Sequence, residues 1–178
     1  MAATGEMRAI ALRVRPHAAC IVPEKREERT TEGGLDAAGG HNHLKGFVAD
    51  LNEAGIRVSL FIEPDPRQLE AARSLGAPVV ELHTGTYCDL FAAGDRAGAE
   101  RERLAAAARF GVSIGLEVHA GHGLTFDNVK PVAAIPELME LNIGHFLIGE
   151  AIFVGLEASV ATMRRLMDEA RANGAGAR

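Results

Sequence analysis

The chain has 178 residues and a mass of 18.8 kDa, which is the size of one domain. Hydrophobic residues make up 47% of it and charged residues 24%, so a disordered chain is not expected. The formal net charge is −5, and Lys and Arg are scattered. This balance argues against a nucleic-acid scaffold or a membrane-surface protein, but it leaves room for a local phosphate site.

The cysteine count and the apolar runs indicate the compartment. Two cysteines, Cys20 and Cys88, cannot build a disulfide framework, so we expect a reduced, cytoplasmic protein. No run approaches about 18 apolar residues, so no transmembrane helix is expected. Residues 1–8 lack a basic segment followed by an apolar one, and we therefore expect no secretory signal.

The first half of the chain alternates apolar runs with amphipathic segments. Residues 18–22 form an apolar run that predicts a buried strand. The spacing of the apolar residues before Gly55 predicts a helix that ends at this glycine, and residues 58–62 predict a second strand. The Asp-Pro pair at 65–66 is typical of a helix start, and this helix is expected to end at Gly76.

The second half continues the alternation. Its first helix is rich in Ala and is expected to end at Gly111, and its last strand is apolar but contains Gly144 and His145. In chain order, we predict a strand at 78–82, a helix at 97–110, a strand at 113–118, a short helix at 127–134, a strand at 143–148 and a helix at 156–173.

Alternating strands and helices predict an α/β fold with a parallel sheet in a single domain over residues 1–178. Five βα units fit either an open doubly wound sheet or part of a (β/α)8 barrel. Length alone favours the open sheet, because a full barrel typically needs about 250 residues. The residues at the strand ends favour the barrel.

Glu and His recur where the predicted strands end. Glu63 follows one strand, Glu81 and His83 close the next, and Glu117 and His119 close a third. Alternation along a strand puts the two members of each pair on one face, which in a barrel is the interior mouth. A single such Glu is usually solvated or ion-paired, and a single His is often bonded within the core. Their recurrence favours acid–base chemistry.

Two glycine-containing segments, 121–123 and 143–145, are candidates for phosphate binding. Glycine lets backbone N–H groups approach an anion closely, and barrel phosphate sites often lie in the loops after the last two strands. No Walker A or G-x-G-x-x-G pattern is present, so nucleotide binding is not supported. A structural role for these turns is equally compatible with the sequence.

A metal site is the weaker alternative. Several histidines with nearby carboxylates could in principle bind zinc, but there is no H-E-x-x-H motif, no Cys pair and no regular ligand spacing. The histidines concerned are His83, His119, His122 and His145.

Several motifs together resemble one known family. They are Val-Pro-Glu-Lys-Arg at 22–26, Thr-Thr-Glu-Gly-Gly-Leu-Asp at 30–36, Glu-Leu-His-Thr-Gly at 81–85, Ala-Gly-His-Gly-Leu-Thr at 120–125 and Asn-Ile-Gly-His at 142–145. The sequence resembles the pyridoxine 5′-phosphate synthases over almost its whole length. The resemblance implies a (β/α)8 barrel without a metal or other cofactor. It also implies condensation of 3-amino-2-oxopropyl phosphate with 1-deoxy-D-xylulose 5-phosphate, with loss of phosphate and water.

The resemblance also implies roles for individual residues. His122 matches the proton donor of the family, and Glu81 matches its transition-state-stabilising carboxylate. Thr30 matches the residue that contacts the pentulose phosphate from a loop. Three positions match backbone contacts to phosphate and product: Gly123, Gly144 and His145. Homo-oligomers are expected by the same resemblance.

The sequence departs from the family pattern in several places. Met1 matches a position just after a catalytic Glu of the family, so about five βα units are expected, corresponding to strands 4–8 of an N-terminally truncated barrel. His119 stands where Asn is usual, and Glu150 where Arg is usual. The 178-residue chain alone is therefore expected to lack synthase turnover. A non-catalytic phosphate-binding or assembly protein descended from the synthase, and less favourably a metal-dependent barrel enzyme, remain alternatives.

Overall fold

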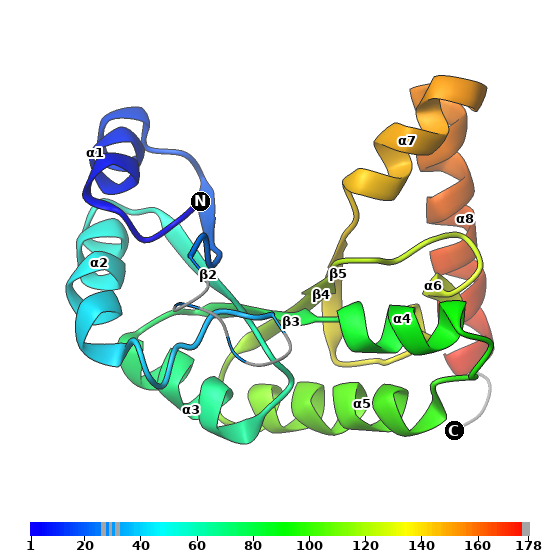
Figure 1. The fold of residues 1–178 in the computed structure, drawn as a ribbon, viewed down its shortest axis with the longest axis horizontal. Helices are drawn as coiled ribbons and strands as arrows, with labels where there is room; N and C mark the ends of the chain where they lie inside the picture. Colours follow the sequence, from blue (N-terminus) through cyan, green and yellow to red (C-terminus); the bar gives the residue numbers. More distant parts are fainter. Residues whose placement is uncertain (26–27, 29, 31–32, 176–178) are drawn as a thin grey trace.

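The computed structural model describes residues 1–25, 28, 30 and 33–175. Five parallel strands form one sheet, and their order in the sheet follows their order in the chain (Figure 1). Parallel neighbours need a crossover connection, and a helix-containing segment supplies each one here. The strands are β1 (Ala18–Ile21), β2 (Arg57–Ile62), β3 (Val79–His83), β4 (Glu117–Gly121) and β5 (Leu138–Asn142).

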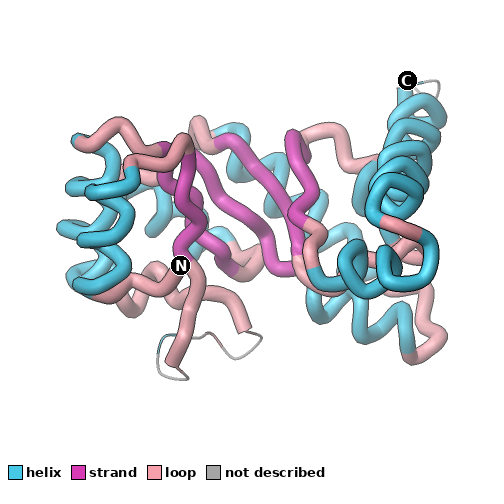
Figure 2. Tube along the Cα trace, turned by 90° about the horizontal axis from the view of Figure 1, so that it is seen from above, coloured by secondary structure: helices cyan, strands magenta, loops and turns pink. Residues whose placement is uncertain are grey.

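The helices wrap around one side of the sheet and leave the other side open (Figure 1). Seen from above, α1 and α2 flank the sheet beside β1, and α7 and α8 stand at the opposite flank (Figure 2). The result is part of a (β/α)8 barrel whose inner face is exposed. The helices are α1 (Gly5–Val14), α2 (His41–Glu53), α3 (Pro66–Leu75), α4 (Gly85–Ala92), α5 (Gly98–Ser113), α6 (Val129–Ala133), α7 (His145–Val154) and α8 (Leu156–Ala175).

Strand β2 shows how the sequence separates the two faces of the sheet. Val58, Leu60 and Ile62 are fully buried on the side that the helices cover. Ser59 and Phe61, which alternate with them, are half-buried on the open side. Burying apolar surface is worth about 25 cal/mol per Å². The packed face therefore stabilises the fold, and the open face is available for polar groups.

The third helix begins and ends as its sequence predicts. The Asp65 side chain accepts a hydrogen bond from the Arg67 N–H, and Pro66 occupies the first turn. The helix ends at Gly76, whose φ of 84° is the left-handed conformation that glycine adopts without strain.

The predicted fifth strand at 143–148 is wrong. The strand lies earlier, at Leu138–Asn142, and α7 occupies the apolar run after Gly144. Because this run is apolar on all sides, its composition alone predicts a buried strand. In the structure the run forms α7, and none of its side chains is fully buried. Two exposed residues, Met139 and Glu140, hid the real strand.

Strand β4 also begins later than predicted. Helix α5 runs past Gly111 to Ser113, and β4 starts at Glu117 rather than 113. A Cβ at position 111 would lie 2.8 Å from Cγ2 of Val118, so this glycine lets the helix pack closely on the strand instead of ending it. Helices α1 and α4 were not predicted.

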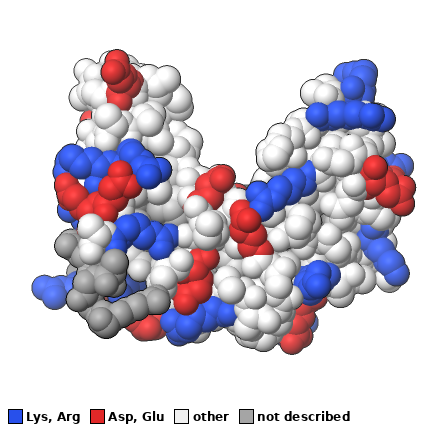
Figure 3. Space-filling view, turned by 180° about the vertical axis from the view of Figure 1, so that it is seen from behind, with Lys and Arg blue, Asp and Glu red and all other residues white. Residues whose placement is uncertain are grey.

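The two flanks of the sheet leave apolar surface uncovered. In the described part of the chain, β1 and β5 each pair on one side only. Ile152 is 79% exposed and Phe153 84% exposed on α7. Charges of both signs are scattered over the face seen in Figure 3. A hollow there separates the part that contains α1 and α2 from the part that contains α7 and α8. None of the helices described combines the length and the apolar character that a membrane span needs.

Candidate active site

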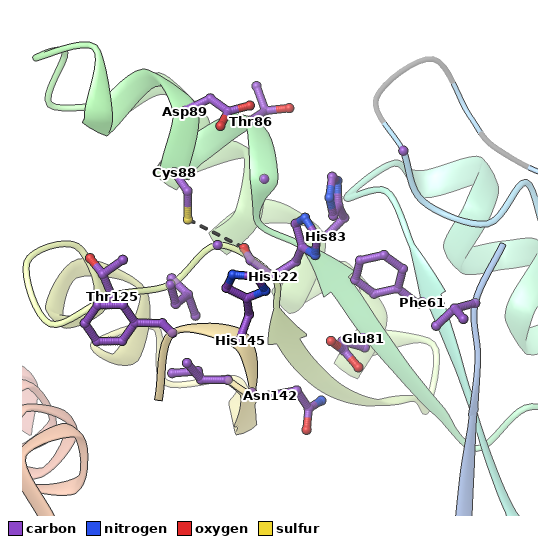
Figure 4. A pocket seen from close by; sticks show the side chains of 18 of the residues that line it. Phe61, Glu81, His83, Thr86, Cys88, Asp89, His122, Thr125, Asn142 and His145 are labelled. Atoms are coloured by element: carbon purple, nitrogen blue, oxygen red, sulfur yellow. Dashed lines mark hydrogen bonds between the residues drawn. The ribbon is translucent and has the colours of Figure 1, made fainter. Parts of the chain in front are cut away.

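A cavity of about 910 Å³ opens at the carboxyl ends of the strands (Figure 4). Its walls come from the ends of β2, β3 and β4, from the first turn of α4 and from the start of α7. Catalytic groups of barrel enzymes gather at this end of the strands. The motif residues that line it include Gly33, Glu81, His83, His122, Gly123, Gly144 and His145.

The Glu81 carboxylate lies deep on the cavity wall. Its Oε2 accepts a hydrogen bond from the Cys20 thiol, with Sγ 3.5 Å away. Burial raises the pKa of Glu81, although hydrogen bonds from Cys20 and Asn142 act in the opposite direction. Burial also raises the pKa of Cys20 to about 12, so this thiol stays protonated and acts as a donor. Glu81 is thus a carboxyl group whose environment favours holding a proton.

Glycine at position 121 makes room for this carboxylate. A Cβ there would overlap Oε1 of Glu81 and would lie 2.7 Å from the Asn142 carbonyl oxygen. His83 and Gly121 are register partners, so the glycine lies beside the cavity end of β3. Only a residue without a side chain fits at this point.

His122 follows β4 with a φ of 85°, a conformation that a residue with a side chain adopts at a cost of about 1–3 kcal/mol. The Thr84 hydroxyl contacts two carbonyl oxygens of this turn, at 2.7 Å from that of Gly121 and 2.5 Å from that of His122. The His122 ring centroid lies 4.9 Å from that of His83 and 6.1 Å from that of Phe61. The turn thereby directs the imidazole into the cavity (Figure 4).

A second carboxylate lies behind His83. Glu63 is only 4% exposed, and its Oε1 lies 3.0 Å from His83 Nδ1. The same oxygen accepts a hydrogen bond of 2.9 Å from the Gly34 N–H. Glu63 and His83 belong to the strand-end pattern of the sequence, but their contact could not be predicted because they belong to different strands.

The proposed phosphate-binding positions line the same cavity. Gly123 has a φ of 82°, and a Cβ there would lie 2.9 Å from Cβ of Cys88. Gly144 precedes α7, and His145 is the first residue of that helix. Unpaired N–H groups and the helix dipole make such an N-terminus favourable for an anion.

Thr30 does not line the cavity. Its hydroxyl accepts a hydrogen bond from the Gly33 N–H at 3.3 Å, and its own N–H donates to the Gly34 carbonyl. Gly33 does line the cavity, so the turn reaches the site through glycine. Three residues of the motifs in this region, Arg26, Thr31 and Glu32, lie outside the described residues.

The expectation that Glu117 and His119 line the mouth is wrong. They share the open face of β4, but the ring Nε2 of His119 is 2.7 Å from Oε1 of Glu117, at the beginning of the strand. Oε2 of Glu117 pairs with Arg57 at 2.5 Å. Alternation placed them on the right face, but it could not tell which end of the strand they serve.

The described residues contain no group of three or more His, Cys, Asp or Glu side chains arranged to hold a metal ion. His83 and His122 pack ring to ring, and His119 bonds to carboxylates outside the cavity wall.

Comparison with known proteins agrees with the geometry. A family model described as the pyridoxal phosphate biosynthesis protein PdxJ matches residues 1–169. The chain belongs to this family. The pyridoxine 5′-phosphate synthase of Rhodospirillum rubrum is 68% identical over 177 residues, which are 99% of this chain and 71% of that protein. The synthase of Ruegeria pomeroyi is 66% identical over 174 residues, covering 97% and 70% of the two chains.

Solved structures show the same kind of fold as this PdxJ family chain. A HpcH/HpaI aldolase/citrate lyase family protein from Burkholderia cenocepacia aligns with a TM-score of 0.56 at 13% identity, covering 95% of this chain and 74% of that one. A xylose isomerase domain protein from Planctomyces limnophilus aligns with a TM-score of 0.50 at 15% identity, covering 76% and 57%. At such low identity these likenesses concern the fold alone.

Proposed function

We propose that the cavity of this chain binds the phosphorylated substrates of pyridoxine 5′-phosphate synthesis, and that His122 and Glu81 handle protons there. The observation that carries the proposal is their position on one cavity wall, with the pKa of Glu81 raised by burial. The substrates are 3-amino-2-oxopropyl phosphate and 1-deoxy-D-xylulose 5-phosphate.

The reaction needs groups that give and take protons repeatedly. The amine attacks the sugar ketone, and dehydration, phosphate elimination, water addition and ring closure follow. His122 acts as the proton donor to a leaving oxygen, because its imidazole projects from a fixed turn into the cavity. Glu81 lines the same cavity, and its carboxyl group, whose pKa burial raises, stabilises the transition state by exchanging a proton with the reacting groups.

The phosphate groups are assigned to the glycine-containing turns that line the cavity. Gly123 and Gly144 supply backbone N–H groups, and His145 supplies the start of α7. Thr30 stays a candidate contact to the pentulose phosphate, and Gly33 brings its turn to the cavity. The proton-handling and the phosphate-binding residues line one cavity of about 910 Å³, which accommodates molecules of this size.

We also propose that the protein works in the cytoplasm as a homo-oligomer built from one domain over residues 1–178. The exposed apolar side chains of α7 and α8 support assembly, since such surface is more stable when covered. They include Ile148, Ile152, Phe153, Val154, Leu156 and Val160.

Titration of the ¹⁵N-labelled chain with pyridoxine 5′-phosphate, and separately with inorganic phosphate, tests the proposal. We expect saturable shifts of the Gly123 and Gly144 amide signals and of the His122 ring signals. The variant His122→Asn keeps a residue that tolerates the turn and should lose the ring response while retaining the amide shifts. Shifts confined to residues outside the cavity would contradict the proposal.

Turnover is measured in parallel by mixing the chain with both phosphorylated substrates and following the formation of pyridoxine 5′-phosphate. Saturable binding without turnover is what the sequence predicts for this chain and also fits the non-catalytic phosphate-binding alternative, whereas turnover would exclude that alternative. Turnover that disappears in His122→Asn would support the assigned proton donor.

A further inference from the structure

We propose that Glu63 and His83 form a positioning pair that fixes the ring of His122 and links it to the turn at Gly33 and Gly34. The pair deepens the proposed function, because it rests on His122 as the proton donor. Neither residue is assigned to the reaction above, and each acts through its neighbours.

Glu63 connects two separate parts of the chain through one oxygen atom. Its Oε1 accepts from the Gly34 N–H at 2.9 Å and lies 3.0 Å from His83 Nδ1. The Arg103 guanidinium approaches its Oε2 at 3.6 Å and is itself paired with Glu100 at 2.8 Å. The carboxylate is therefore buried among groups that fix its position.

The contact with Glu63 determines how the His83 ring presents itself. An ionised carboxylate only accepts hydrogen bonds, so the contact with Glu63 requires that Nδ1 of His83 carries a hydrogen. Phe61 packs edge-on against the ring at 5.1 Å. A Cβ at Gly85 would lie 2.6 Å from Cε1 of His83, so the backbone passes close to the ring on that side.

His83 transmits this order to His122. Their ring centroids are 4.9 Å apart, and Phe61 contacts both rings. Gly33 closes the same cluster, since a Cβ there would lie 3.3 Å from Cε1 of His83. If the turn at Gly33 and Gly34 moves, Glu63 loses the hydrogen bond from the Gly34 N–H, and the His83 ring loses its packing against Gly33. The geometry thus couples the turn to the orientation of His122 through a contiguous set of contacts.

Spectroscopy of the ligand-free chain tests the coupling without relying on any substrate. Two-bond ¹⁵N–¹H spectra should show His83 protonated at Nδ1, and the Gly34 amide should exchange slowly. In Glu63→Met, which removes both acceptor contacts, we expect Gly34 exchange to rise at least tenfold and the His122 ring signals to shift. Glu63→Gln keeps an acceptor oxygen and should restore both readouts in large part.

The matched control is the other Glu–His pair of the sheet. Glu117→Gln alters the contact with His119 outside the cavity wall and should leave the Gly34 exchange and the His122 signals unchanged. Unchanged His122 signals in Glu63→Met, with faster Gly34 exchange, would overturn the proposal, because Glu63 would then only anchor the turn. If Glu63→Met does not fold, the wild-type spectra decide, because a His83 ring protonated at Nε2 instead of Nδ1 would overturn the proposal equally.

A ligand titration then separates this proposal from the function it deepens. We expect Glu63→Met to weaken pyridoxine 5′-phosphate binding about threefold to tenfold, whereas Glu63→Gln and Glu117→Gln should bind nearly as the wild type does. If neither the wild type nor any variant binds pyridoxine 5′-phosphate at the cavity, the proposed function is contradicted. The spectra of the ligand-free chain would still decide the role of Glu63 and His83.

Discussion

The two ends of the open sheet face carry the same residue types but treat them differently. At the amino end, Glu117 is about one-third exposed and is paired with Arg57 and with His119. At the carboxyl end, Glu63 and His83 are buried together, and His83 faces a cavity. Charges at the amino end neutralise one another in contact with solvent. At the carboxyl end, burial holds the pair together, and His83 is the member that lines the cavity.

The carboxyl pKa values follow this difference. A hydrogen bond from Arg57 lowers the pKa of Glu117, with His119 adding to the effect. Burial raises the pKa of Glu81 despite its hydrogen bonds. A Glu beside a His on a strand is therefore not informative by itself, and the partners supplied by neighbouring strands decide between ion pairing and acid–base chemistry.

The largest expected effect comes from filling the space beside Glu81. Gly121→Ala places a Cβ against the Glu81 carboxylate and the Asn142 carbonyl, so it should lower the free energy of unfolding by about 1–3 kcal/mol and abolish ligand binding at the cavity. Urea denaturation and the phosphate titration measure the two effects. Gly149→Ala is the control, because nothing lies within 4 Å of a Cβ there. Wild-type binding by Gly121→Ala would mean that Glu81 is not confined as described.

The second prediction is that the carboxyl groups of Glu81 and Glu117 change the free energy of unfolding in opposite directions as pH rises. A raised pKa means that the folded state binds the Glu81 proton more tightly than the unfolded chain, so this carboxyl costs stability as pH rises above its ordinary value of 4.5. Glu81→Gln should therefore gain stability relative to wild type between pH 4 and pH 8.

Glu117 should show the reverse. Its pKa is lowered, so its contribution is present above 4.5 and is lost as pH falls through the folded-state pKa. Glu117→Gln should be less stable than wild type at pH 7, and the difference should shrink as pH falls below 4.5. Urea denaturation at several pH values measures the free energy of unfolding of Glu81→Gln and Glu117→Gln. The same pH dependence in both variants would contradict the difference between the two ends of the sheet face.

The third prediction concerns the thiol beside Glu81. Cys20→Ala removes the donor to Glu81 Oε2 and should cost about 1 kcal/mol, whereas Cys20→Ser keeps a donor and should cost less. The pKa values of Cys20 and Cys88, raised by burial to about 12 and about 11, predict slow reaction of both with Ellman's reagent at pH 8 until urea is added. Rapid labelling of the folded chain would contradict this environment.

The smallest effect is expected at the amino end. Arg57→Ala should lower the free energy of unfolding by at most about 1 kcal/mol, because its pair with Glu117 is accessible to water. Added salt should shrink the difference further, and urea denaturation at low and high salt measures both. A loss above about 2 kcal/mol would show that this end is as tightly built as the cavity end.

The sequence predicted elements with local signals and missed those that depend on neighbours. The helix from Pro66 carries its own cap in Asp65, and four of the five strands were located as apolar runs. Strand β5 carries the exposed residues Met139 and Glu140, so its apolar character became visible only once the sheet was formed.

The site shows the same limit. The motif residues Glu81, His122 and Gly144 do meet at one cavity, while their chemical roles stay predictions. The link between Glu63 and His83 joins the ends of two strands, which no local spacing specifies. Likewise, the turn at Thr30 reaches the cavity through Gly33, because backbone direction places the glycine and not the hydroxyl at the wall.

The left-handed turn at His122 has a consequence for any library built at that position. A side chain with a branched Cβ is penalised by the backbone before any chemistry is considered, whereas Gly and Asn adopt this φ readily. Selection for folding alone should therefore enrich Gly and Asn at position 122. If His persists at position 122 in a screen for turnover of the substrates, the need for its imidazole outweighs the cost of the left-handed backbone at this residue.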